Sequence, residues 1–123
     1  MGKGKPRRYN PLKRNKPHKG DPPDNVHRWF GQYFCGCGNP PEALAALNEV
    51  LGIYQPTDDN MFVSLEKLKV FEEKHGEGFA LLLLYLLEGA GITQHGGSVY
   101  GAWMTTLGRD LKGFVEANPD YEP

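Results

Sequence analysis

The chain has 123 residues, of which 39% are apolar and 24% are charged, and this balance predicts one globular domain with a modest core. Its longest apolar run, Phe79–Leu87, has nine residues, well short of the roughly 20 that a membrane-spanning helix needs. Two cysteines in Cys-Gly-Cys spacing exclude a disulfide framework, so we expect a soluble protein in a reducing, intracellular setting.

The formal net charge of −1 hides an unequal distribution of charge along the chain. Residues 1–20 hold eight of the fourteen Lys and Arg residues and no acid, whereas the rest of the chain holds six basic and all fifteen acidic residues. Such a block, rich in Pro and Gly, is typical of a disordered interaction arm. It suits contacts to phosphates without selection of bases, and an acidic protein surface is the alternative partner. The basic residues of this arm are Lys3, Lys5, Arg7, Arg8, Lys13, Arg14, Lys16 and Lys19.

These compositional changes divide the chain into three parts. Residues 1–25 are predicted to form the basic arm and a turn-rich hinge, residues 26–118 a helical domain, and residues 119–123 a frayed, acidic end.

An aromatic cluster opens the predicted helical domain. Trp29, Phe30, Tyr33 and Phe34 have the spacing of one helix face, which we expect to be part of the core. An exposed aromatic patch for stacking or partner docking is the alternative.

Two cysteines follow, beside glycines and just before a predicted helix. Cys35 and Cys37 could offer two thiolates to a zinc ion, with His27, His75 and His95 as candidates for the other ligands. Only one pair has ligand spacing, so we favour two small core cysteines over a zinc site.

Two amphipathic helices are predicted in the middle of the chain. The first begins after Asn39, which can cap it, and ends before Pro56; residues 57–63 are predicted to be a loop. Ser64 opens the second helix and Gly76 ends it. The apolar side chains expected to face inward are Leu44, Leu47, Val50, Leu51, Leu65, Leu68 and Phe71.

The segment 78–88 is apolar on every side, which predicts a central helix buried by its neighbours. A β-hairpin near residues 92–105 follows, in which Gly96 and Gly97 would supply a positive-φ turn. Trp103 is the expected core anchor of this hairpin, because Trp brings the largest apolar area.

A final helix begins after Thr105 or Thr106 and carries an apolar stripe. The predicted fold class is therefore mainly α: a small domain of four to five helices with one β-hairpin. The stripe comprises Leu107, Leu111, Phe114 and Val115.

The stretch "LLEGAGITQHGGSVYGAWMTTLGRDL" resembles one half of the winged-helix pattern. The residues that carry the resemblance are Gly91, Ile92, Trp103, Thr105, Gly108 and Arg109. It implies a wing with His95 and Ser98 at its tip, preceded by a recognition helix. Here the preceding segment, "GFALLLLYLLEG", contains no Lys or Arg, so we do not expect it to read bases.

Two further elements, "CGCGNPPE" and "HGGSVYGAWMT", resemble elements of small proteins from phages of actinobacteria, in the same order. The resemblance spans roughly residues 33–115 and implies a phage setting without a particular mechanism.

Motifs for catalysis are absent from the sequence: it contains no Gly-x-Ser-x-Gly, no phosphate-binding glycine loop and no His-Glu-x-x-His. The cluster Glu72–Glu77 is expected to be solvated surface. We therefore expect a non-enzymatic phage-type accessory protein whose basic arm binds a nucleic-acid backbone, in the host cytoplasm or associated with a virion. The alternative is an assembly or interaction protein, a virion component or host-factor inhibitor, that docks through the arm and the aromatic cluster.

Overall fold

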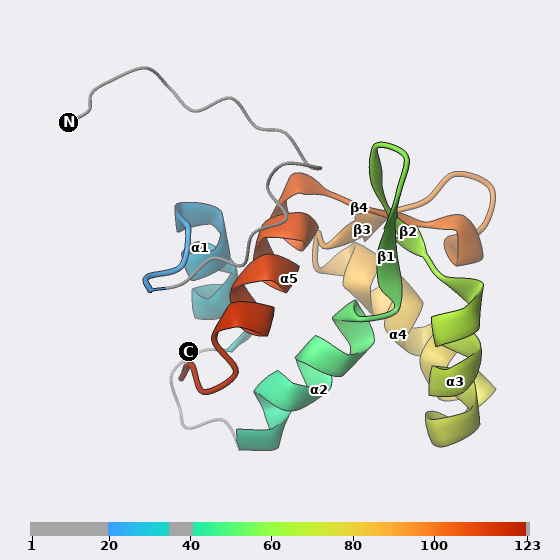
Figure 1. Ribbon diagram of the computed structural model, residues 1–123, viewed down its shortest axis with the longest axis horizontal. Helices are drawn as coiled ribbons and strands as arrows, with labels where there is room; N and C mark the ends of the chain where they lie inside the picture. Colours follow the sequence, from blue (N-terminus) through green and yellow to red (C-terminus); the bar gives the residue numbers. More distant parts are fainter. Residues whose placement is uncertain (1–19, 35–40, 123) are drawn as a thin grey trace.

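The computed structural model describes residues 20–34 and 41–122, which form five α-helices, a short 3-10 helix and four strands (Figure 1). This confirms a mainly helical fold. The basic residues of the arm, together with Cys35, Cys37 and Asn39, lie outside the described residues. The elements are α1 (Asp24–Tyr33), α2 (Pro41–Leu51), β1 (Tyr54–Thr57), β2 (Asn60–Val63), α3 (Leu65–His75), α4 (Glu77–Gly89), β3 (Thr93–Gln94), η2 (Val99–Gly101), β4 (Trp103–Met104) and α5 (Thr106–Ala117).

The four strands form one antiparallel sheet in the order β1-β2-β4-β3, made of two hairpins joined by a Phe62–Trp103 pair. The predicted hairpin near residues 92–105 is present as β3 and β4. The prediction of a loop over residues 57–63 was wrong, because β1 and β2 form a second hairpin there. Pro56 and the acidic turn favoured a loop. However, β1 is an edge strand, where a residue without an N–H is tolerated.

The joint between α3 and α4 follows the predicted signals. The Ser64 hydroxyl accepts a hydrogen bond from the Lys67 backbone N–H at 3.2 Å, which caps α3. Gly76 ends α3 with φ of +102°, a conformation that favours glycine, and α4 begins at the next residue. The two helices therefore turn back on each other and pack together (Figure 1).

The central helix is α5 rather than the leucine-rich α4. It contacts α1, α2 and β4 (Figure 1). Its Leu111, Phe114 and Val115 are fully buried. Helix α4 buries only one side, with Ala80, Leu84 and Leu87, so the prediction that it is enclosed by its neighbours was wrong. Leu65 was also expected to face inward, but it is 67% exposed.

Helix α1 packs its aromatic cluster on α5, largely as predicted. The Trp29 indole N–H donates to the Ala90 carbonyl at 3.0 Å, and Trp29 and Phe30 are buried. The Phe30 ring also contacts the ring of Tyr121, at 5.3 Å between centroids. The segment predicted to fray therefore includes a residue that packs on the core.

The hairpin of β3 and β4 differs in detail from its prediction. Its strands have two residues each, and the long connection between them includes η2. Gly96 and Gly97 do not have positive φ, so no tight glycine turn forms. Met104 is fully buried whereas Trp103 is half-buried, because adjacent strand residues point to opposite faces. Met104, rather than the predicted Trp103 beside it, is therefore the residue that anchors this hairpin in the core.

Candidate functional site

The distribution of charged residues separates the chain into a basic part and an acidic part. The described residues carry six basic and all fifteen acidic side chains, a formal charge of −9, and the arm carries the remaining eight basic residues. Three of the six basic side chains of this folded body have partners within it: Lys74 contacts Glu49, Arg109 contacts Asn60, and Lys112 contacts Glu116. Positive charge available to a polyanion is therefore concentrated in residues 1–20.

The segment that resembles a winged-helix start is a structural joint in this fold. The Thr105 hydroxyl accepts from the Gly108 backbone N–H at 3.0 Å and donates to the Gly91 carbonyl at 2.7 Å, so Thr105 rather than Thr106 caps α5. Arg109 Nη1 donates to Asn60 Oδ1 at 2.6 Å and to the Met104 carbonyl at 2.8 Å. The guanidinium therefore ties α5 to two strands.

The two polar residues of the predicted wing tip also have local partners. The Ser98 hydroxyl accepts from the Tyr100 backbone N–H at 3.1 Å and caps η2. His95 Nδ1 lies 2.8 Å from a carboxylate oxygen of Glu88, and the His95 ring packs edge-on against Tyr85. These contacts link the connection between the strands to α4.

The predicted zinc ligands are not brought together within the described part of the chain. His27 is exposed on α1, and His95 lies beside Glu88. No group of three or more His, Cys, Asp and Glu side chains among residues 20–34 and 41–122 could hold a metal ion. The zinc hypothesis therefore depends on Cys35 and Cys37, which lie outside the described residues.

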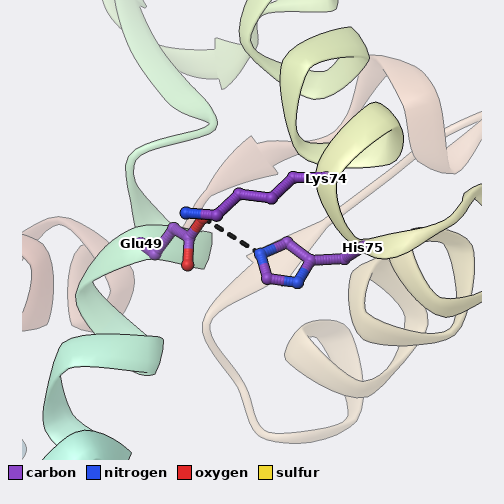
Figure 2. Close-up of polar contacts among 3 residues, drawn as sticks. All are labelled: Glu49, Lys74 and His75. Atoms are coloured by element: carbon purple, nitrogen blue, oxygen red, sulfur yellow. Dashed lines mark hydrogen bonds and ion pairs between the residues drawn. The ribbon is translucent and has the colours of Figure 1, made fainter.

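Two residues at the end of α3 contact a carboxylate on α2, and the sequence does not reveal this pairing. Lys74 Nζ and His75 Nε2 each lie 3.1 Å from the same carboxylate oxygen of Glu49. Figure 2 shows both side chains reaching from α3 toward Glu49 on α2. The hydrogen bonds from His75 and Lys74 lower the pKa of the Glu49 carboxyl. These two contacts join the end of α3 to α2.

An open depression of about 300 Å³ lies next to these contacts. Its lining is mostly apolar, and Glu49 and Lys67 are its two charged residues. The residues that line it are Glu49, Gly52, Ile53, Lys67, Val70 and Phe71.

The largest departure from the sequence-based expectation is an exposed apolar surface on α4. Four large side chains share one side of the helix: Phe79, Leu82, Tyr85 and Leu86, which are 50%, 55%, 51% and 56% exposed. We call this set the α4 face. Between the terminal Glu77 and Glu88 the helix is apolar on every side, so this part of its sequence gives no sign of which side the core covers.

No helix in the described part of the chain has both the length and the apolar character needed to cross a membrane. Comparison with family models, with curated proteins and with solved structures found no match. We therefore infer the function from the residues themselves.

Proposed function

We propose that the chain is a non-enzymatic accessory protein that binds a nucleic-acid backbone through its basic arm, without selecting bases. The observation that carries the proposal is the division of charge: +8 in the arm against −9 in the described residues. The phage-type motifs support a setting in the host cytoplasm or on a virion.

Binding to phosphates, rather than reading of bases, fits the distribution of donors. The helix before the predicted wing, α4, has no Lys or Arg, and Arg109 donates to acceptors inside the fold. An acidic body repels phosphates, so contact with nucleic acid is confined to the arm. Such contacts give affinity and no sequence preference.

A matched pair of variants tests this proposal. One replaces Lys3, Lys5 and Arg7 of the arm by Gln, and the other replaces the exposed Arg28, Lys67 and Lys69 of the body by Gln. Both remove three positive charges. By fluorescence anisotropy with labelled oligonucleotides of unrelated sequence, we expect the arm variant to lose at least about tenfold in affinity at low salt.

The body variant should bind within about twofold of the unchanged protein. Equal losses in the two variants would contradict the proposal. So would a single sequence that binds about 100-fold more tightly than the others, because backbone contacts do not discriminate.

A second candidate is an assembly or interaction protein, and the exposed α4 face favours it. Monomers rarely expose contiguous apolar patches larger than a few hundred Å² without a function for them. Docking through the aromatic cluster has less support, because Trp29 and Phe30 are buried and Tyr33 is about half exposed.

Chromatography before and after nuclease treatment separates the two candidates. Nucleic acid that co-elutes with the full chain, and not with a chain lacking residues 1–20, supports the first. A defined polypeptide that stays bound after nuclease treatment supports the second.

A further inference from the structure

We propose that the α4 face binds a second copy of this chain, in an antiparallel, two-fold symmetric pair of α4 helices. This inference builds on the second candidate function and is independent of the basic arm.

The exposed area fits the apolar part of a dimer interface. Four side chains, each about half exposed, present roughly 400 Å² of surface per copy, taking about 200 Å² for a large side chain. A stable interface of standard size buries about 800 Å² per partner, of which rather more than half is apolar. The α4 face alone therefore supplies most of the apolar area that such an interface needs.

The charged residues of α4 and of the whole body favour a second copy of the chain over a phosphate or an anionic lipid as the partner. The only charged residues of α4, Glu77 and Glu88, lie on the other side of the helix at 100° per residue, and Glu88 is paired with His95. Without Lys or Arg, α4 lacks the groups that hold phosphates or anionic lipids. On a body with a formal charge of −9, an uncharged face is where two copies meet with least repulsion.

The pattern of large and small residues on α4 is self-complementary. Gly78 and Gly89 flank the α4 face, and a Cβ added at either would meet nothing within 4 Å. In an antiparallel pair centred between residues 83 and 84, Leu82 of one copy faces Tyr85 of the other, and Gly78 faces Gly89. Glycines at both ends allow the helix backbones to approach closely, and each contact occurs twice, as two-fold symmetry requires.

The parts of the chain outside the described residues do not match this surface. Residues 1–19 and 35–40 contribute only Met1, Tyr9 and Leu12 as large apolar side chains. These are too few and too widely spaced to cover four adjacent large side chains.

Sedimentation velocity of the full chain tests the proposal, after nuclease treatment and in high salt. We expect a species of twice the monomer mass at concentrations of about 10–100 µM. Leu82→Glu should raise the dimer dissociation constant by at least about 100-fold, because it buries two unpaired carboxylates. Leu65→Glu makes the same change at a comparably exposed site on α3 and should leave the dimer unchanged.

Mixing two variants tests the register. Tyr85→Lys alone should be monomeric, as should Leu82→Glu. An equimolar mixture should form a heterodimer, because the introduced carboxylate at position 82 of one copy faces the introduced ammonium group at position 85 of the other. Circular dichroism checks that each variant is folded, and Leu86→Glu replaces Leu82→Glu if the latter is not. A mixture that stays monomeric would overturn the antiparallel pairing.

A wild-type chain that is monomeric at about 100 µM would overturn the proposal, as would larger, open-ended assemblies. So would equal effects of Leu82→Glu and Leu65→Glu. Deletion of residues 1–20 should leave the dimer intact. A wild-type chain that binds nucleic acid but stays monomeric would therefore refute this inference alone, and a wild-type chain that dimerises but does not bind nucleic acid would refute the proposed function alone.

Discussion

Replacement of Gly108 by Ala should be among the most damaging single changes in this fold. A Cβ at Gly108 would lie 2.2 Å from the Ile92 carbonyl oxygen, whereas a comfortable C···O contact is about 3.3–3.6 Å. The same oxygen accepts hydrogen bonds from the Thr105 backbone N–H at 3.0 Å and from its hydroxyl at 3.1 Å. Moving α5 away by about 1 Å would therefore also break the hydrogen bonds that Thr105 donates to Ile92.

The expected cost adds two terms. Overpacking against a backbone atom costs about 1–3 kcal/mol, and loss of a hydrogen bond from Thr105 to Ile92 costs about 0.5–1.5 kcal/mol. We therefore expect Gly108→Ala to lower the free energy of unfolding by about 3 kcal/mol, which is more than about 10 °C in Tm for a domain of this size.

Gly113 is the matched control, because it lies in the same helix and a Cβ there would meet nothing within 4 Å. Gly113→Ala should raise stability by about 0.5–1 kcal/mol, the usual preference for Ala over Gly inside a helix. Urea unfolding followed by circular dichroism measures both variants. Equal stabilities for the two would refute the close approach of α5 to Ile92.

Three further predictions concern stability. Met104→Ala should cost about 2–5 kcal/mol in urea unfolding, and Trp103→Ala only about half of the 3–5 kcal/mol of a buried Trp, because Met104 rather than Trp103 is fully buried. The lowered pKa of Glu49 means that its contribution to stability is present above the ordinary carboxyl pKa and is lost as the pH falls through the folded value. Wild type should therefore lose more stability than Glu49→Gln between about pH 6 and pH 3, by less than about 1 kcal/mol for so exposed a group, and equal losses would contradict the Glu49 contacts. Deletion of residues 1–20 should leave Tm within about 2 °C in a thermal melt, since the arm has few apolar side chains to bury; a larger drop would show that it packs on the body.

Local signals in the sequence predicted the helix boundaries well where one residue type decides them. Ser64 and Gly76 bound α3 because a hydroxyl cap and a positive-φ glycine act within a single turn of helix. The spacing of Leu111, Phe114 and Val115 likewise predicted the buried side of α5.

Features that depend on distant parts of the chain were not predictable in this way. Pro56 favoured a loop, and only the position of β1 at the sheet edge makes a strand acceptable there. The contact of Glu49 with His75 joins residues 26 positions apart and has no local signal. The exposed side of α4 depends on which neighbours cover it, and the apolar run between Glu77 and Glu88 carries no information about that.

The features of the candidate site also fall into those that the sequence indicates and those that require the structure. The basic arm is a prediction from composition alone, because the charge of a segment can be counted without its fold. The local roles of Arg109, His95 and Ser98 required the structure, since each has its partner on another element or in a tight turn. The α4 face also required the structure.

The salt dependence of nucleic-acid binding tests the central claim most directly. If the arm engages its eight basic residues, the logarithm of the binding constant should fall with the logarithm of salt concentration at a slope of about −7 for duplex DNA. This corresponds to a loss of about four orders of magnitude between 50 and 200 mM salt. A variant with all eight arm residues replaced by Gln should lose nearly all binding. A slope near zero, or a slope that is unchanged in this variant, would contradict the account.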